Sequence, residues 1–550
     1  MHPTTDETPT SDARRLFPTD RAILAALAVI VVAGALLRFG SCAVPRLNVD
    51  EGWTYYLTRN PLPDVLWNLQ KDRHPPLPYL LAKAMMDSGP HDELRLRLPF
   101  AGLGVLGVLA AFTLGCRLFG PAAGLGGAGL TAISYLAWEY DTWMRGYGLL
   151  TLLSLVTSLC WVQVCTGRPR TWAVGYAVSG AVLLYSHYLG VLALGTQALL
   201  ALFPTREGEW LSPRDRLRRL VPCWIFMSLA FVPWLPMLKL QMTRRAARGD
   251  LSDSGSPVLA AVTAMRVLPL MTGLDSLPLL FRSWLGEGTF AARIVVWITG
   301  SGLVALAAWT GARHLRNRPM ALRVVLALLL PPLLFIALIA LKTPELNRIR
   351  YYAPYIPYLG MLAGVAIASR PRVFGPLAAL VVLVNSLVFA SYLQGPYFRS
   401  AAWQAPAAFV TAHQNRARVV VGFGNHMMYA FSYYYAGDEV SYDIRNVDRP
   451  TYPTTPRYTE LGKLPLYRLW LEEVPVELEA RLRGIDDVLL VLWMDGGESS
   501  SVRQWFGERF DVLDMQFVDN IEEDGRVQTL LLHRHPPSPD GPPAGGAASP

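Results

Sequence analysis

Two adjacent carboxylates, Asp50 and Glu51, follow the first long apolar run of the chain, within the sequence NVDEGW at residues 48–53. Carboxylates beside a membrane surface are costly unless they are solvated, paired or used in chemistry. One interpretation is a solvated loop in which Asp50 begins a helix as its N-cap. The other is that Asp50 is a general base, which accepts the proton of an attacking hydroxyl while Glu51 or a nearby cation orients it.

Further titratable side chains lie close to later apolar runs. The sequence DRHPPL at 72–77 contains a double proline, which denies helix to His74 and fixes its imidazole where the next apolar segment begins. Its alternative role is a helix-start signal. Within nine residues the chain then has Glu139, Asp141, Arg145 and Tyr147. The fork of an arginine suits a phosphate group, although Arg145 could also serve as an interfacial anchor.

Two more polar clusters occur further along the chain. His187 lies in the sequence YSHY at a joint between helices, where a structural histidine is the default interpretation. The later cluster precedes the pair Tyr351-Tyr352 and contains Lys342, Glu345, Asn347, Arg348 and Arg350. Cations beside a membrane bind phosphate or the headgroups of lipids. Taken with the earlier clusters, these patterns give a set of candidates for binding a phosphate-bearing substrate: His74, Arg145, Tyr147, His187, Lys342, Arg348 and Arg350.

The composition shows which elements must position these residues. The 550-residue chain is 52% hydrophobic and 17% charged, whereas soluble domains have about 25% charged residues. The deficit favours lipid as the solvent. The net charge of +8 is spread over short loops and does not form a basic patch with interleaved aromatics, so we expect no nucleic-acid partner. The five cysteines lie in or beside apolar runs without a CxxC pair, so we interpret them as small apolar residues.

About eleven apolar segments have the length of a membrane-crossing helix. They are residues 22–40, 98–118, 121–138, 147–166, 171–186, 188–204, 220–238, 292–310, 322–341, 352–369 and 373–393. In an alternative interpretation, residues 171–204 form one broken span instead of two. The stretch 75–86 is apolar but too short to cross, so we expect it to lie along the membrane surface. Residues 1–21 are polar and show no signal-peptide cleavage site, which predicts a cytoplasmic N-terminal segment.

The short loops predict the orientation. With the N-terminus inside, four loops rich in arginine lie on the cytoplasmic side, as the positive-inside rule favours. They contain Arg168 and Arg170, the cluster Arg214–Arg219, the segment Arg313–Arg323, and Arg370 with Arg372. An odd number of spans then exports everything after about residue 394. All the polar clusters described above, including the first outside loop at 41–97, fall on the non-cytoplasmic face.

The exported tail predicts a separate α/β domain at residues 397–535. It has strand-like segments at 418–423, 487–493, 510–517 and 527–533, with helix-like stretches at 401–412 and 472–483. Residues 536–550 are rich in proline, glycine and alanine and are predicted to be disordered. The fold class is therefore a polytopic α-helical membrane protein, with its transmembrane domain at 22–396 and an extracytoplasmic α/β domain at the C-terminus.

A carboxylate base, several cations and an apolar helical bundle together suit a phosphate ester with a lipid tail. The order of the motifs also resembles the bacterial, protein O-mannosyltransferase-like (dolichyl-phosphate-mannose-protein mannosyltransferase-related) branch of the C-type glycosyltransferases. The matching residues, in order, are Asp50-Glu51, HPPL at 74–77 followed by Tyr79, LRLP at 96–99, GCRLFG at 115–120 and RGY at 145–147. The turn at 186–188 and the pair Arg350-Tyr351 are similar too, so the resemblance covers about residues 22–400.

The resemblance implies transfer of a sugar from a polyprenyl-phosphate carrier to a hydroxyl acceptor on the outer face, usually with inversion. Asp50 takes the place of the catalytic aspartate of the family. An acid that commonly stands two residues before the arginine is Trp143 here. Whether Asp141 or Glu139 substitutes for it stays open, and with it a divalent metal such as Mg or Mn; no cofactor is otherwise implied.

Two other classes of protein fit the number of spans. A secondary transporter would place its polar residues near the middle of the membrane, in broken helices and often in repeated halves. A lipid-linked-sugar ligase or polymerase would depend on a large outside loop late in the chain. Here the polar clusters concentrate at one surface and in the first outside loop, which favours the glycosyltransferase. The sugar and the acceptor, whether protein, lipid or glycan, are not determined by these motifs.

Overall fold

The structure is a computed structural model, and the residues it describes fall into two compact units. They are residues 20–42, 44, 47–89, 92–205, 208–247, 257–281, 285, 288–340, 349–394, 403–417, 419–423, 431, 433–435, 442–443, 478–479, 482–494, 497–520 and 525–536. The first unit comprises Met1–Pro45 and Pro61–Gly395, and the second comprises Arg46–Asn60 and Pro396–Pro550. The start of the first predicted outside loop therefore belongs to the same unit as the C-terminal part of the chain.

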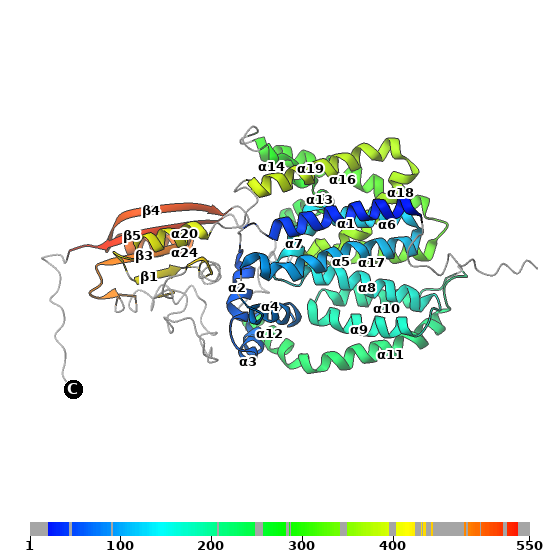
Figure 1. Ribbon diagram of the computed structural model, residues 1–550, viewed down its shortest axis with the longest axis horizontal. Coiled ribbons are helices and arrows are strands. Elements are labelled where there is room, and N and C mark those ends of the chain that lie inside the picture. Colours follow the sequence, from blue (N-terminus) through cyan, green and yellow to red (C-terminus); the bar gives the residue numbers. More distant parts are fainter. Residues whose placement is uncertain are drawn as a thin grey trace, which may run out of the picture. The chain divides into compact units, whose positions relative to one another are not determined.

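The first unit is helical throughout its described residues, and Figure 1 shows its long helices side by side. Its helices are α1 (Arg21–Cys42), α3 (Leu62–Asn68), η2 (Leu69–Lys71), α4 (Leu77–Asp87), α5 (Glu93–Phe119), α6 (Pro121–Ile133), α7 (Tyr135–Thr142), α8 (Tyr147–Cys165), α9 (Thr171–Ser186), α10 (Gly190–Leu202), α11 (Pro213–Phe231), η3 (Val232–Trp234), α12 (Leu235–Ala247), α13 (Pro257–Thr272), η4 (Leu274–Ser276), α14 (Leu277–Leu280), α16 (Thr289–His314), α17 (Pro319–Ala340), η7 (Ile349–Tyr355), α18 (Ile356–Ser369) and α19 (Pro371–Gln394).

Six helices of the described chain are long and apolar enough to cross a membrane: α1, α5, α8, the continuous α11–α12 segment, α16 and α19. Other predicted spans coincide with helices of 13 to 16 residues, namely α6, α9, α10 and α18. At 1.5 Å per residue such helices fall short of a hydrocarbon core of about 30 Å. The chain is therefore a membrane-type helical protein, and the count of eleven spans stays a prediction.

Helix α13 was not expected from the sequence. It has 16 residues, with Pro269 inside it and Arg266 in its second half, so its apolar run is too short and too interrupted to be recognised as a span. Residues 171–204 form two helices with a break between them, which fits both two spans and one broken span, so the choice between these alternatives stays open. Helix α9 ends at Ser186, His187 adopts an extended conformation, and α10 begins at Gly190.

Glycines allow α6 to approach α18 closely. A Cβ atom on Gly126 would lie 2.4 Å from the backbone oxygen of Gly360, and one on Gly364 would lie 2.3 Å from that of Ala122. Small residues at a helix contact are the usual means of bringing two membrane helices together. Because η7 leads directly into α18, this contact also fixes the segment that carries Arg350.

The second unit is built on a five-stranded sheet in the order β2-β1-β3-β5-β4. Strand β1 pairs in parallel with both β2 and β3, whereas β5 is antiparallel to both β3 and β4. All four strand segments predicted from the sequence lie in strands of this sheet. The elements of this unit are α2 (Val49–Thr58), α20 (Gln404–His413), β1 (Val419–Phe423), β2 (Tyr442–Asp443), β3 (Asp487–Met494), α24 (Gly497–Gly507), β4 (Phe510–Asn520) and β5 (Gly525–Arg534).

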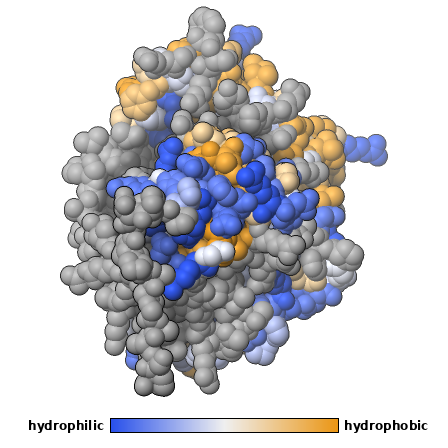
Figure 2. All heavy atoms as spheres, turned by 90° about the vertical axis from the view of Figure 1, so that its left-hand side faces the viewer, coloured by the Kyte–Doolittle hydropathy of each residue, from blue (hydrophilic) through white to orange (hydrophobic). Residues whose placement is uncertain are grey.

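Both faces of the central strand β3 are buried, whereas several side chains of the edge strand β4 are exposed. Along β3, Val488 and Leu490 face one apolar cluster, which includes Trp505 of α24, and Leu489 faces the other, which includes Val410 of α20. This alternation is what a strand covered on both sides requires. On the face of the molecule that Figure 2 shows, hydrophilic and hydrophobic side chains are mixed among the described residues. Two thirds of the helix predicted at 472–483 lie outside the described residues, as do almost all of the predicted N-terminal segment and of the predicted disordered tail.

Candidate functional site

The centre of the candidate site is a buried carboxylate, Asp72, which binds three other side chains of the first unit. One of its oxygens lies 2.8 Å from His74 Nδ1, and the other accepts a hydrogen bond of 2.5 Å from the Tyr79 hydroxyl. The guanidinium of Arg145 lies 3.4 Å from Asp72 Oδ2 and also donates to the Tyr79 hydroxyl. Asp72 is 6% and Arg145 4% exposed, so this network is almost fully removed from water.

The charges around Asp72 keep it ionised. Burial by itself raises the pKa of a carboxyl group, but the nearby Arg145 guanidinium and the hydrogen bond from His74 outweigh burial and hold the pKa of Asp72 well below its usual range. A carboxylate with so low a pKa is a poor proton acceptor near neutral pH. Asp72 therefore suits the orientation of Arg145 and His74, and it does not suit the role of a general base.

Two histidines face each other beside this network. The ring centroids of His74 and His187 are 5.2 Å apart, and the ring of Tyr147 lies 5.6 Å from that of His187. His187 Nδ1 accepts a hydrogen bond of 3.1 Å from the backbone N–H of Leu189, which assigns the proton to Nε2 in the neutral ring. Among the described residues nothing pairs with that buried Nε2. His187 thus offers a hydrogen-bond donor that a bound substrate can use.

The environment also keeps His187 neutral. Burial comes first among the causes that lower its pKa well below the usual value, and the neighbouring His74 and the guanidinium groups of Arg350 and Arg145 add to it. A neutral imidazole donates a hydrogen bond without requiring a counter-charge. The tautomer follows from the hydrogen bond made by the other ring nitrogen.

Gln241 of α12 links the segment that carries His74 to the turn between α9 and α10. Its amide nitrogen donates to the backbone oxygens of Leu69 and His74, at 2.7 and 3.2 Å, and its oxygen accepts from the Tyr188 hydroxyl at 2.6 Å. Trp234 in turn donates to the Tyr188 hydroxyl at 2.9 Å. This chain of buried bonds fixes His74 relative to the turn that carries His187, although the residues are far apart in sequence.

Arg350 approaches the same group of residues from η7. Its guanidinium carbon lies 5.8 Å from the ring centroid of Trp143 and 5.6 Å from that of Tyr147, which are cation–π distances. The ring of the adjacent Tyr351 lies 6.1 Å from that of His187. The structure therefore brings His74, Arg145, Tyr147, His187 and Arg350 of the predicted site together. Lys342 and Arg348 lie outside the described residues.

Asp50 and Glu51 lie in the first turn of α2, in the second unit. Asn48 is the N-cap: its side chain accepts a hydrogen bond of 2.9 Å from the Glu51 backbone N–H, and the Glu51 carboxylate reaches back to Asn48 to complete a capping box. Glu51 is 0% exposed and so has a structural task. Asp50 is partly exposed at the positive end of the helix dipole, which favours its anion. The N-cap interpretation of Asp50 is wrong by two residues.

Two tyrosines from the C-terminal part of the chain hold the segment that carries α2. The backbone N–H of Leu47 donates a hydrogen bond of 2.8 Å to the Tyr434 hydroxyl, and the ring of Tyr55 meets that of Tyr433 edge to face at 4.8 Å. These contacts explain why residues 46–60 form one compact unit with the C-terminal sheet. They also give the C-terminal unit a direct means of fixing Asp50.

The two metal candidates are engaged with other partners. Asp141 is 3% exposed, and its Oδ2 accepts hydrogen bonds of 3.0 and 2.7 Å from the fully buried Arg38 of α1. Glu139 accepts a bond of 3.1 Å from the indole of Trp143, the residue that stands where the family commonly has an acid. In the part of the chain that the structure describes, no three His, Cys, Asp or Glu side chains converge as metal ligands do.

Sequence reasoning missed three residues of this network, Asp72, Tyr79 and Gln241. Asp72 and Tyr79 were visible within the motif around HPPL, but neither was assigned a role. The signal that identifies them is their contact with Arg145, which is separated by 73 residues from Asp72 and by 66 from Tyr79. Gln241 carried no signal at all, because a single glutamine beside an apolar run is unremarkable in a sequence.

The first unit is a bundle of membrane-type helices with a buried polar network beside the ends of several of them. Residues 73–236 match the family model described as dolichyl-phosphate-mannose-protein mannosyltransferase, over less than half of the chain. The match begins at Arg73 and includes His74, Arg145, Tyr147 and His187. The resemblance found in the sequence is thereby confirmed at the level of the superfamily. A comparison with curated proteins gives no match.

The solved structures of similar fold include ArnT from Cupriavidus metallidurans in the apo state. It has 13% sequence identity and a TM-score of 0.54, and the match covers 93% of this chain and 98% of that one. ArnT of the same organism bound to undecaprenyl phosphate has 14% identity, the same coverage and a TM-score of 0.50. The oligosaccharyltransferase of Archaeoglobus fulgidus, in complex with Zn and sulfate, has 13% identity and a TM-score of 0.48, covering 84% of this chain and 67% of that one.

Proposed function

We propose that this protein transfers a sugar from a polyprenyl-phosphate carrier to an acceptor hydroxyl on the non-cytoplasmic face of the cell membrane. The observation that carries the proposal is the convergence of Arg145, Arg350 and His187 Nε2–H around the Asp72 network. Of these residues, Arg145 and His187 lie in the segment 73–236 that matches the mannosyltransferase family model. The structure of ArnT with bound undecaprenyl phosphate supports a carrier of this chemical class.

The proposed reaction needs two kinds of group. The acceptor oxygen attacks the anomeric carbon as its proton passes to Asp50, and the bond from that carbon to the phosphate oxygen breaks with its electron pair remaining on the phosphate. Arg145, Arg350 and the neutral His187 then face a phosphate that gains negative charge, which is where fixed donors in a water-poor site act most strongly. The products are the glycosylated acceptor and free polyprenyl phosphate, with inversion at the anomeric carbon.

The decisive experiment is incubation of the purified protein with a panel of polyprenyl-phosphate sugars and detection of released polyprenyl phosphate. Release that depends on both the protein and an acceptor hydroxyl supports the proposal. Translocation of an unchanged lipid-linked sugar would support a transporter instead. Joining of diphosphate-linked glycans with release of the diphosphate would support a ligase or polymerase.

Replacing Arg145 by lysine is expected to weaken binding of polyprenyl phosphate by about tenfold, although the charge is kept. An ammonium group cannot reproduce the fork that contacts Asp72, Tyr79 and a phosphate together, and a charge-assisted bond contributes about 1.5–3 kcal/mol. Equilibrium binding of radiolabelled undecaprenyl phosphate measures the effect. Arg316→Lys is the matched control, because Arg316 is exposed and remote in sequence. If Arg145→Lys and the native protein bind undecaprenyl phosphate with equal affinity, Arg145 is an interfacial anchor and does not contact the phosphate.

We further propose that α2 and the C-terminal unit lie on the same, non-cytoplasmic side, as an odd number of spans and the basic loops imply. The grouping of residues 46–60 with the C-terminal sheet supports a common side. Cysteines introduced at Leu62 and Leu513, which are 45% and 43% exposed, are expected to react with an impermeant maleimide added to intact cells. A cysteine at Arg316 should react only after lysis. Protection of either outside position would contradict this topology.

A further inference from the structure

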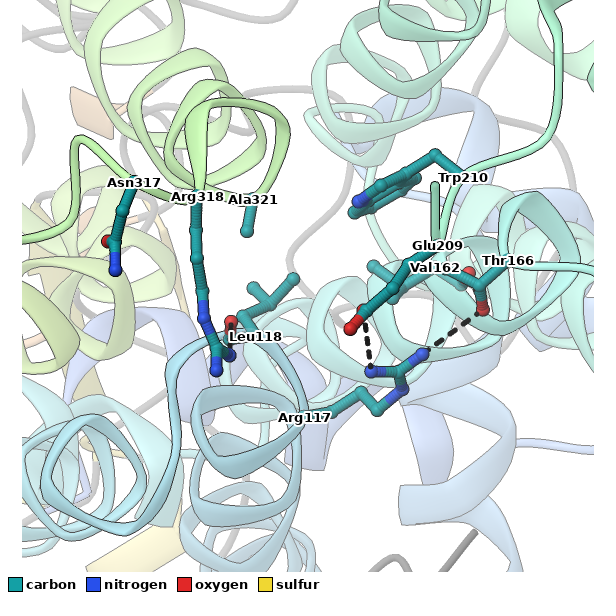
Figure 3. Close-up of a pocket in the computed structure, with 9 residues that line it drawn as sticks. All are labelled: Arg117, Leu118, Val162, Thr166, Glu209, Trp210, Asn317, Arg318 and Ala321. Atoms are coloured by element: carbon teal, nitrogen blue, oxygen red, sulfur yellow. Dashed lines mark hydrogen bonds and ion pairs between the residues drawn. The ribbon is translucent and has the colours of Figure 1, made fainter. Parts of the chain in front are cut away.

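The first unit has a second polar pocket, at the other end of α8 from Arg145. The helix begins at Tyr147, next to the candidate site, and ends at Cys165, which places its ends about 28 Å apart at 1.5 Å per residue. The pocket has a volume of about 240 Å³ and lies between the last turns of α5 and α8, the segment at 209–210 and the start of α17. Figure 3 shows its lining side chains.

Arg117 of α5 is the main charged group in this pocket. Its side chain is 18% exposed, and its hydrogen bonds to the neutral side chains of Gln163 and Thr166 are both 3.3 Å long. The carboxylate that reaches it among the described residues belongs to Glu209, at 3.9 Å, and that side chain is 75% exposed. An ion pair of this length with a solvated partner contributes little. The guanidinium is therefore largely withdrawn from water without a strong anionic partner in this part of the structure.

The surrounding charge is positive as well. Arg318, at the entry to α17, donates a hydrogen bond of 3.1 Å to the backbone oxygen of Leu118 at the end of α5, and its positive charge acts on Arg117 together with that of Arg168. In Figure 3, Arg318 comes from the upper left, Arg117 from below and Trp210 from the upper right. A buried cation is costly unless it is paired, so this arrangement favours an anion.

We propose that this pocket binds a phosphate group, held by Arg117 and Arg318 against the apolar surface of Leu118 and Trp210. The volume suits a headgroup-sized anion and is smaller than the sites that enclose drug-sized ligands. The ends of α5 and α8 lie where lipid headgroups lie if those helices cross the membrane, and the surrounding loops are the basic ones predicted to be cytoplasmic. The phosphate belongs either to an anionic lipid of that leaflet or to a soluble phosphate ester. The inference does not depend on the proposed transferase reaction.

The test uses the purified full-length protein with two probes, inorganic phosphate in detergent and nanodiscs containing phosphatidylglycerol or phosphatidylcholine. Arg117→Gln is expected to weaken binding by about tenfold or more, because it removes a charge-assisted contact. Glu209→Gln should strengthen binding roughly two- to fivefold, because it removes an exposed carboxylate that competes with the ligand. A purely structural Arg117–Glu209 pair would instead lose stability in both variants and gain affinity in neither.

Arg316→Gln serves as the control, since Arg316 is an exposed arginine of the same basic loop and does not line the pocket. Binding of inorganic phosphate that Arg117→Gln abolishes identifies a soluble phosphate ester as the ligand. Retention of phosphatidylglycerol alone, counted by native mass spectrometry and lost in Arg117→Gln, identifies a lipid headgroup. Equal binding of both probes by the native protein, Arg117→Gln and Glu209→Gln would overturn the proposal.

Discussion

Replacing Asp50 by asparagine is expected to lower turnover by about 10²–10⁴-fold, the usual contribution of a general base. Asparagine keeps the shape of the side chain and the position in the first turn of α2, and it removes the group that accepts the proton. The variant should still insert into the membrane and should still bind polyprenyl phosphate, because the proposed phosphate contacts lie in the other unit. Release of polyprenyl phosphate by correctly inserted protein is the measurement.

Glu51→Gln is the matched control for Asp50→Asn. Glutamine can replace glutamate in a capping box, so the bond from the Asn48 segment to residue 51 survives and α2 keeps its N-terminus. We expect Glu51→Gln to retain most of the turnover, whereas Glu51→Ala should lose about 1 kcal/mol of stability with the cap. Near-native turnover in Asp50→Asn would show that the base lies elsewhere, with Asp141 next to be tested in spite of its bond to Arg38.

The class of fold could be predicted from the sequence because a membrane-crossing segment must be apolar and must satisfy its own backbone hydrogen bonds. Long apolar runs such as 22–40 and 373–393 leave no alternative to a helix in a bilayer. The strands at 487–493 and 527–533 were also readable, because their β-branched and leucine-rich runs end at polar residues. The number of spans was harder to predict. Helices α6 and α18 are short, and their composition does not determine whether they cross the membrane.

The candidate site was only partly predictable for a different reason. His74, Arg145 and His187 stand out by residue type and by the prolines and tyrosines beside them. Their partners Asp72 and Gln241 become significant only through contacts between distant segments, which a single sequence does not contain. The grouping of α2 with the C-terminal sheet is of the same kind, since it depends on the contacts that Tyr433 and Tyr434 make with residues 47 and 55.

Asp72→Asn is expected to have the second large effect, on stability and on donor binding together. Removing one partner of a buried ion pair costs about 3–5 kcal/mol, because the other charge stays buried without compensation. Arg145, at 4% exposure, would be left facing an amide, and Tyr79 would lose the carboxylate that holds its hydroxyl. Thermal unfolding in detergent should show a much lower midpoint. Asp87→Asn is the matched control, since Asp87 is 62% exposed and its pair with Lys83 contributes little.

The pH dependence of Asp72 distinguishes it from a proton acceptor. Its pKa is lower in the folded protein than in the unfolded chain, so its contribution to stability is present above the unfolded value of about 3.9 and is lost only as the pH falls through the lower, folded value. Between pH 5 and 8 the carboxylate keeps its charge. The acid limb of a turnover profile should therefore be unchanged in shape when Asp72 is replaced, whereas it should move or vanish in Asp50→Asn.

A double replacement separates the positioning of Arg145 from a general loss of structure. If Asp72 acts by pairing with Arg145, removing both charges in Asp72→Asn/Arg145→Gln leaves neither member of this pair buried without the other, and the double variant should be more stable than the sum of the two single losses predicts. Its affinity for polyprenyl phosphate should stay low, because the phosphate contact is gone. The KM for the donor should rise in Asp72→Asn more than kcat falls, since Asp72 orients Arg145 and accepts no proton. Strictly additive losses of stability would show that the two side chains act independently.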